Sequence, residues 1–358
     1  MRLVWGEVVH IAEARGDLQR LTVRVEGTEA PAIAYPRLSG RCEVGERVLV
    51  NTTAVDLGLG TGGFHLVVAR EGAGVGVDEP SGGHIMKLRY TPLQCDVLAV
   101  EEAASEHAAV MAAATSLEGM PVVCCGLHSQ VLPAVAAARQ YDPSLRVAYL
   151  MTDTASLPLA FSDVVANMRE AGLLDATITS GQSFGGDLES VSVHSGLLAA
   201  RHVAHADLAV VAPGPGITGT ATPYGHGGVG AGETINAAAA LDGRPVAVLR
   251  MSFADPRPRH RGVSHHSLVA LRRIALAPAV VAVPVLPSSE ARAVDQALED
   301  AGIWERHTRV DVVIDEMPDT RGIAMRSMGR SVAEDPAFFL AACAGGTIAA
   351  QMCARDED

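Results

Sequence analysis

The segment MPVVCCGLHSQVLPAVAAARQYDPSLRVAYLMT, residues 120–152, decides the fold class of this chain. It begins with an apolar run, passes through a short polar loop into an alanine-rich stretch, and ends in a second apolar run. Two continuous apolar strands joined by a helix are typical of a parallel sheet covered on both faces. The adjacent Cys124 and Cys125 would point to opposite faces of the first strand, and we expect both to be core residues.

The same alternation of strand, polar loop and helix fills the chain from about residue 96 onward. The apolar strand candidates are residues 96–100, 120–126, 146–152, 176–181, 207–213, 245–252, 279–285 and 309–315. The helical stretches are residues 105–117, 130–141, 161–172, 188–206, 232–243, 265–275 and 289–302. This order predicts an α/β domain over residues 96–358, a three-layer, mostly parallel α/β/α arrangement.

The start of the chain has a different pattern. Short β-rich runs separated by Gly, Pro and Asp are spaced as antiparallel strands are, and they cover residues 4–14, 18–27, 30–36, 46–55 and 64–70. Residues 1–75 are therefore predicted to form a small antiparallel β domain that resembles a barrel. Residues 76–95 fit neither pattern, and we expect a connector there.

Composition narrows the function classes. The 358 residues carry a net charge of −13, and no basic block offsets it, which argues against binding to nucleic acid. Residues 1–17 contain no long apolar stretch, so we expect no secretory signal and a cytoplasmic protein with reduced cysteines. The uncharged run of residues 336–354 is long enough to span a membrane, but its small and polar residues favour a buried Ala/Gly helix and no membrane contact.

Polar side chains crowd the loops that follow the predicted strands. All strand-to-helix loops of a parallel sheet emerge at one edge, which is where open α/β proteins bind their ligands. His128 and Asp153 follow strands of adjacent repeats and could form an acid–base pair, with the carboxylate orienting the imidazole. Asp187 stands before the predicted helix 188–206, where we expect it to be the N-cap.

Gly214, Gly216 and Gly219 form a G-x-G-x-x-G pattern directly after a strand. Such glycines let backbone N–H groups approach a phosphate or another anion. A glycine tract rather than a helix follows, so a purely structural loop is an equal alternative. Residues 213–232 contain eight glycines and no Asp, Glu, Lys or Arg, which is typical of a loop.

Residues 257–266 concentrate three arginines and three histidines in a chain that is poor in charge. Arginine forks bind carboxylate or phosphate, and imidazole transfers protons near neutral pH. We expect the anion ligands Arg257, Arg259 and Arg261, and the catalytic residues His265 and His266 together with His128 and Asp153; the alternative is a solvated basic loop. Ser264 is the expected N-cap of the next helix. Metal binding by His128, Asp153, His265 and His266 stays an alternative, but no HxxxH spacing is present and no metal site is predicted.

Lys87 is the single lysine among 28 cationic residues. A position that remains lysine in a chain that otherwise uses arginine would suit a compact ammonium that contacts an anionic ligand. Chance survival of one lysine is an equal alternative.

Six segments together resemble the bacterial family known as domain of unknown function 3866. They are GHIMKLRYTPLQ (83–94), GLHSQ (126–130), SGQSFGGDLESV (180–191), HSGLLAARHV (194–203), APGPGITGT (212–220) and SFADPRPRHRGVSHHSLVALRRIALAPA (252–279). The resemblance spans nearly the whole chain and implies a bacterial cytoplasmic protein. It supplies no catalytic residues and no cofactor.

The sequence thus favours an enzyme, a hydrolase or transferase, that acts on a small anionic or phosphorylated metabolite at the carboxyl edge of the sheet. Two alternatives stay open: a non-catalytic module that binds or senses a metabolite, and an assembly protein. The sequence does not decide whether the protein is an enzyme, which cofactor it uses or whether it forms a homo-oligomer.

Overall fold

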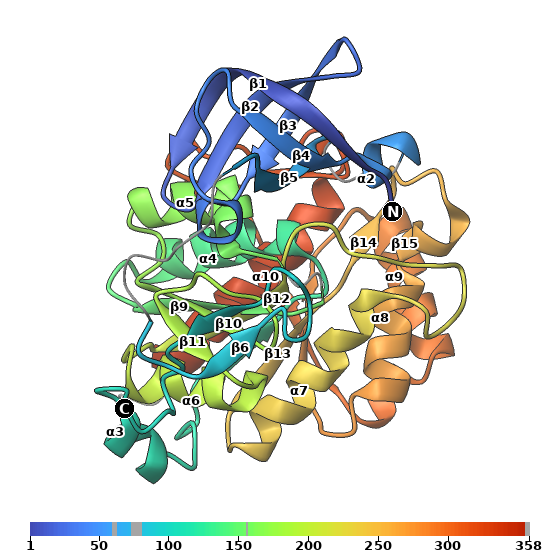
Figure 1. Ribbon diagram of the computed structural model, residues 1–358. Helices are drawn as coiled ribbons and strands as arrows, with labels where there is room; N and C mark the ends of the chain where they lie inside the picture. Colours follow the sequence, from blue (N-terminus) through green and yellow to red (C-terminus); the bar gives the residue numbers. More distant parts are fainter. Residues whose placement is uncertain (59–62, 73–80, 155–156, 355–358) are drawn as a thin grey trace. The chain divides into compact units, whose positions relative to one another are not determined.

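The computed structural model describes residues 1–58, 63–72, 81–154 and 157–354. The chain divides into two compact units, Met1–Val97 and Leu98–Asp358 (Figure 1). Residues 73–80 lie outside the described residues; they include residues 76–80, with which the predicted connector begins.

The first unit contains a closed barrel of five strands in the order β1-β2-β3-β5-β4. The strands are β1 (Leu3–Arg15), β2 (Leu18–Val25), β3 (Thr28–Ala34), β4 (Arg47–Asn51) and β5 (His65–Arg70). Alternate side chains of these strands, such as Val8, Val23 and Val50, fill the barrel. Only β3 and β5 pair in parallel, and the other pairs are antiparallel. The predicted barrel is therefore confirmed.

Two short helices, α1 (Pro36–Ser39) and α2 (Thr53–Asp56), precede and follow β4. A small hairpin of β6 (Ile85–Lys87) and β7 (Cys95–Val97) ends the first unit. Lys87 lies on β6, opposite Cys95, and its side chain is fully buried. Residues 96–100 were expected to begin the large sheet. β7 pairs with β6 instead, and Ala99, two residues beyond β7, forms an isolated parallel bridge with Glu189.

The second unit is built on a sheet of eight strands in which every neighbouring pair is parallel. Its order is β11-β10-β9-β12-β8-β13-β16-β17. The strands are β8 (Pro121–Cys124), β9 (Val147–Thr152), β10 (Ala176–Ser180), β11 (Leu188–Ser190), β12 (Leu208–Pro213), β13 (Arg244–Val248), β16 (Val280–Pro284) and β17 (Thr308–Val312). Two further two-stranded ribbons join β14 (Met251–Ser252) to β15 (Gly262–Val263) and β18 (Arg326–Ser327) to β19 (Arg330–Ser331).

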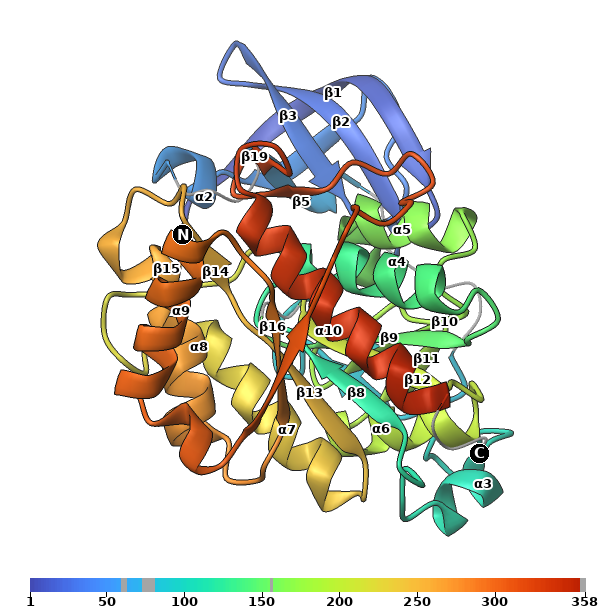
Figure 2. The same ribbon diagram turned by 180° about the vertical axis from the view of Figure 1, so that it is seen from behind.

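Helices cover both faces of this sheet, as predicted. The helices are α3 (Ala108–Ala113), α4 (Val131–Tyr141), α5 (Asp163–Glu170), α6 (Val193–His202), α7 (Gly230–Ala240), α8 (His265–Val269), α9 (Ser288–Asp300) and α10 (Pro336–Ala354). Helix α10 crosses the sheet beside α4 on one face, and α6 and α7 cover the other (Figures 1 and 2). Cys124 belongs to the core on the α7 side and Cys125 to the core on the α4 side, so both are buried and point to opposite faces.

The stretch of residues 188–206 differs from the prediction. Its first three residues form the edge strand β11, and α6 begins only after Ser192, whose side chain accepts a hydrogen bond from the Ser195 N–H. Asp187 is therefore not the N-cap: its Oδ2 accepts hydrogen bonds from the backbone N–H and the hydroxyl of Thr177 on β10.

Helix α10 is the apolar run of residues 336–354. It is the one helix of the described residues that is long and apolar enough to cross a membrane, yet 67% of its apolar window is buried inside the protein. Gly346 lies directly against the backbone of Ala134 on α4. The helix is thus a core helix whose small residues allow close packing, as the sequence predicts.

Candidate functional site

The residues that were expected to be functional follow four strands of the large sheet, and the structure divides them into separate places. His128 follows β8, Asp153 follows β9, the glycine loop follows β12, and residues 257–266 follow β13. Because all eight strands are parallel, these loops leave the sheet at the same edge. Lys87 lies in the first unit, and its role as a ligand stays a prediction.

His128 is partly buried. Its Nδ1 lies 3.1 Å from the Tyr149 hydroxyl, and its Nε2 lies 2.7 Å from the Ser162 hydroxyl. Burial lowers the pKa of His128 to about 4. Both ring nitrogens are therefore engaged, and the expected pair with Asp153 does not form. Asp153 is exposed, and its Oδ2 accepts a hydrogen bond from the backbone N–H of Gln182.

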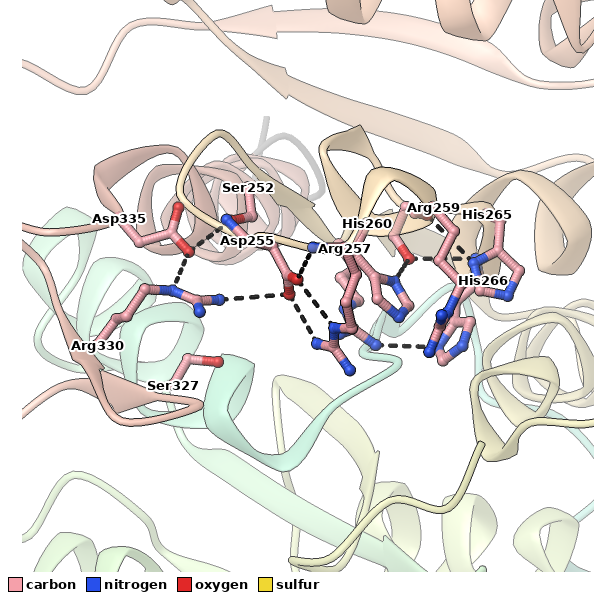
Figure 3. Close-up of polar contacts among 12 residues, drawn as sticks. Ser252, Asp255, Arg257, Arg259, His260, His265, His266, Ser327, Arg330 and Asp335 are labelled. Atoms are coloured by element: carbon pink, nitrogen blue, oxygen red, sulfur yellow. Dashed lines mark hydrogen bonds and ion pairs between the residues drawn. The ribbon is translucent and has the colours of Figure 1, made fainter. Parts of the chain in front are cut away.

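Four imidazoles gather at the carboxyl side of β13. The ring of His266 is stacked on that of His226 at 3.7 Å between centroids, with an angle of 7° between the planes. The rings of His265 and His260 contact that of His266 at centroid distances of 4.4 Å and 4.9 Å. His226, His260 and His266 are each more than nine-tenths buried. Figure 3 shows His260, His265 and His266 side by side, close to Arg259.

The local sequence explains how the imidazoles are presented. Ser264 is the N-cap of α8, as predicted, since its side chain accepts a hydrogen bond from the backbone N–H of His266. The same hydroxyl lies 2.8 Å from His260 Nδ1, so one serine fixes the helix start and the His260 ring. The ribbon of β14 and β15 holds both ends of the loop that contains His260. His226 arrives from the glycine-rich loop, where it forms an isolated bridge with Gly219.

Every histidine of the cluster has a lowered pKa. Burial is the largest cause in each case, and the positive charge of Arg250 contributes in all four. The pKa of His260 falls to about 3 and that of His266 to about 2. The four rings are consequently neutral at pH 7, with lone pairs available on their unprotonated nitrogens.

Arg250 stands at the centre of the charged part of the site. It lies two residues beyond the end of β13, is 7% exposed, and places Nη1 3.0 Å from Nδ1 of His266. Burial and the neighbouring Arg257 lower its pKa to about 10, so it stays charged at neutral pH. A cavity of about 20 Å³, which holds one water molecule at most, adjoins Arg250 and His266.

A chain of ion pairs lies beside Arg250. Asp255 accepts two hydrogen bonds from the guanidinium of Arg257 and lies 3.5 Å from that of Arg330, which also pairs with Asp335 (Figure 3). Arg257 holds the pKa of Asp255 well below its usual range. Ser252 donates a hydrogen bond to Asp335. Two arginines are thus neutralised by two aspartates.

The remaining predicted ligands are in different environments. Arg259 and Arg261 are exposed, whereas the Arg257 fork is occupied by Asp255. Gly214 is buried against Met151, and Gly216 is exposed with a positive φ of 90°. Whether backbone N–H groups of this loop bind an anion stays a prediction.

Sequence reasoning missed His226, Arg250 and Arg330. His226 stands 40 positions before His266, so no ligand spacing indicated that the two rings would meet. Arg250 was counted within an apolar strand. A single charge in an otherwise apolar run at the carboxyl end of a strand is the signal that could have identified it.

The fold and the site define an α/β protein with an N-terminal barrel and a polar site of histidines and arginines at the carboxyl edge of its parallel sheet. The chain belongs to the family described as protein of unknown function (DUF3866), whose model matches residues 31–346. None of the curated proteins compared with the chain matches it.

Proposed function

We propose that the protein is an enzyme that binds a small anionic metabolite, of the phosphorylated class, at the carboxyl edge of the sheet and hydrolyses it or transfers a group from it. Arg250 is the observation that carries this function. It is buried and charged, and no carboxylate among the described residues pairs with it. Among the described residues, its guanidinium makes one hydrogen bond, to neutral His266. Since a buried charge is costly without a counter-ion, an anionic ligand would stabilise it strongly.

The balance of charge around Arg250 supports the same conclusion. The charge of Asp255 raises the pKa of Arg250 against the larger effect of burial. Asp255 and Asp335 already pair with Arg257 and Arg330, however, so two carboxylates face three guanidinium groups. Arg259 and Arg261 add two exposed cations to the same segment. Excess positive charge at Arg250 in an acidic protein favours an anionic ligand over a neutral one.

The donors available to the ligand suit a phosphate group. A guanidinium offers a planar fork that matches two phosphate oxygens. Because Arg250 only donates, Nδ1 of His266 must accept, and the proton of the neutral ring lies on Nε2. His266 can therefore donate a second hydrogen bond to the ligand.

Proton transfer is best assigned to His265. A general base works best when its pKa lies near the operating pH, and the pKa values of His266 and His260 are too low for that. His265 is only partly buried, and its Nδ1 lies 3.2 Å from the carbonyl oxygen of Arg259, which requires the proton on Nδ1. In the protein without a bound metal ion, its Nε2 lone pair would accept the proton. We place this activity in the cytoplasm of a bacterium.

Calorimetric titration with inorganic phosphate, pyrophosphate and a panel of phosphorylated metabolites tests the anion site. We expect saturable binding that is lost in Arg250→Gln and weakened by about tenfold in Arg250→Lys, which keeps the charge but not the fork. Arg309→Gln is the matched control, because Arg309 pairs with exposed Asp295 and Asp311 on and near β17. Unchanged binding in Arg250→Gln would remove the basis for this function.

Release of phosphate from the metabolites that bind then separates an enzyme from a binding module. With the wild type and His265→Ala both treated with a chelator, we expect turnover by the wild type and a large loss of kcat in the variant with little change in affinity. Tight binding by the wild type without turnover would identify a non-catalytic module that senses the metabolite.

A further inference from the structure

Three of the four clustered imidazoles are arranged as ligands of one metal ion. His226, His265 and His266 each offer one ring nitrogen, and the three nitrogens lie within 4.8 Å of one another. Two of the three side chains are more than nine-tenths buried. His260 is not part of this set, and its Nδ1 lies 2.8 Å from the Ser264 hydroxyl.

Two of these rings have their tautomer fixed by the backbone. His226 Nε2 lies 2.9 Å from the carbonyl oxygen of Pro223, and His265 Nδ1 lies 3.2 Å from that of Arg259. A carbonyl oxygen only accepts, so these nitrogens carry the protons and the opposite nitrogens carry lone pairs. Imidazoles that bind a metal are held in this way, with the second nitrogen donating to a carbonyl or carboxylate.

The two lone pairs point to no partner among the described residues. His226 Nδ1 and His265 Nε2 are buried atoms for which the described part of the chain supplies no hydrogen bond. A buried acceptor without a donor costs about 1–3 kcal/mol, so a fold rarely keeps two of them side by side. A Lewis acid placed between them would satisfy both at once.

Glycine keeps the space between the rings open. A Cβ on Gly228 would lie 3.1 Å from His226 Nδ1 and 3.1 Å from His266 Nδ1. A methyl group at this position would therefore press on two of the three imidazoles without removing either.

We propose that His226, His265 and His266 form a binding site for one divalent transition-metal ion of the zinc type, and that the ion binds together with the anion held by Arg250. Three neutral imidazoles suit Zn²⁺ and its neighbours in the first transition row, and they leave a fourth position open. The second half of the proposal rests on the proposed function, because it requires the anion site.

The position of Arg250 explains why the two ligands are coupled. Arg250 donates to Nδ1 of His266, so it occupies that lone pair. If Nδ1 of His266 binds the ion, the Arg250 guanidinium must move away from that nitrogen. If Nε2 of His266 binds the ion, the proton of the ring moves to Nδ1, which then can no longer accept a hydrogen bond from Arg250. In both cases the ion displaces Arg250 from His266 and makes its fork available to an anion, which also offsets the added positive charge.

Co²⁺ and Zn²⁺ binding to the chelator-treated full-length protein tests the site. We expect one ion per chain, a visible d–d spectrum with Co²⁺, and competition between the two metals. Binding should weaken more than about tenfold in His226→Ala and in Gly228→Ala. Gly230→Ala is the matched control, since its Cβ would have no neighbour closer than 4.0 Å. No binding by the wild type, or equal binding by the wild type and the two site variants, would overturn the proposal.

Measuring metal binding in the presence of phosphate distinguishes this inference from the proposed function. Inorganic phosphate, kept below the solubility limit of the metal salts, should tighten Co²⁺ binding in the wild type and leave it unchanged in Arg250→Gln. Stoichiometric metal binding that ignores phosphate would support the three-imidazole site and overturn its coupling to Arg250. Phosphate binding with no metal binding would overturn the site and leave the proposed function intact.

Discussion

Replacing Gly346 by alanine tests whether α10 and α4 lie as close together as the structure shows. A Cβ at Gly346 would overlap the carbonyl oxygen of Ala134 and lie 2.7 Å from the carbonyl carbon, whereas ordinary contact begins at 3.4 Å. The distance to the carbonyl carbon is thus about 0.7 Å too short, so the two helices must separate by at least that amount. A gap of this size removes a quarter to a half of the dispersion energy at their contact.

The expected loss of stability is about 2 kcal/mol. Overpacking a well-filled core costs up to about 3 kcal/mol, and the contact here is with backbone, which has no rotamer to change. The higher helix propensity of alanine offsets about 1 kcal/mol of this overpacking cost. For a domain of this size, the melting temperature should fall by roughly 4–8 °C.

Urea unfolding and scanning calorimetry of the full chain provide the measurement. Gly230→Ala is again the control, because Gly230 has a helical φ of −56° and open space around its Cβ. It should be as stable as the wild type or slightly more stable, by up to about 1 kcal/mol. If Gly346→Ala matched the control, the close approach of α10 to α4 would be refuted.

Three further outcomes are expected. Asp255→Asn should lower the unfolding free energy by about 2 kcal/mol at pH 7. Because Arg257 depresses the pKa of Asp255, this stabilisation is present above the usual Asp pKa and is lost as the pH falls through the depressed value. A stability difference between variant and wild type that persists undiminished in strong acid would contradict this expectation. Ser264→Ala should cost about 1 kcal/mol through the lost cap of α8, while Ser264→Thr should retain most of it, as urea unfolding will show. Cys124 and Cys343 are buried, and burial raises the pKa of Cys343 to about 12. Mass spectrometry should therefore find both thiols unlabelled by iodoacetamide in the native protein and labelled after unfolding. Labelling of either thiol under native conditions would contradict its burial.

Elements with strong local signals could be predicted from the sequence. The strands of the barrel and seven of the eight strands of the sheet are apolar runs bounded by turn residues, and Ser264 precedes α8 in the usual N-cap position. The strand β11 could not be predicted, because three residues carry too little periodicity and they continue directly into a helical pattern. Its pairing with β10 is decided by tertiary contacts, among them the Glu189 carboxylate, which accepts a hydrogen bond from Thr179.

The candidate site could be predicted only in part. Residues 257–266 were predicted to be functional because arginine and histidine are concentrated there. This segment does contain three of the four clustered histidines. The fourth, His226, comes from the loop after β12, and β12 is separated from β13 by β8 in the sheet. The spacing of residues along the chain could not predict the contact between His226 and His266, because the order of the strands in the sheet brings the two residues together. The expectation that His128 would pair with Asp153 fails for a related reason: Tyr149 and Ser162, distant in sequence, already satisfy both ring nitrogens.

Burial favours a functional site over a solvated basic loop in residues 257–266. Arg259 and Arg261 are exposed, as in a solvated loop, but His260 and His266 are more than nine-tenths buried beside buried Arg250. Apolar side chains of similar volume would stabilise the same positions at least as well, because they carry no desolvation penalty. Natural sequences depart from such local rules mainly where function requires it. Within the described part of the chain, two lone pairs without a donor and one guanidinium without an ion-pair partner lie in one place. A bound anion and metal ion would remove all three departures.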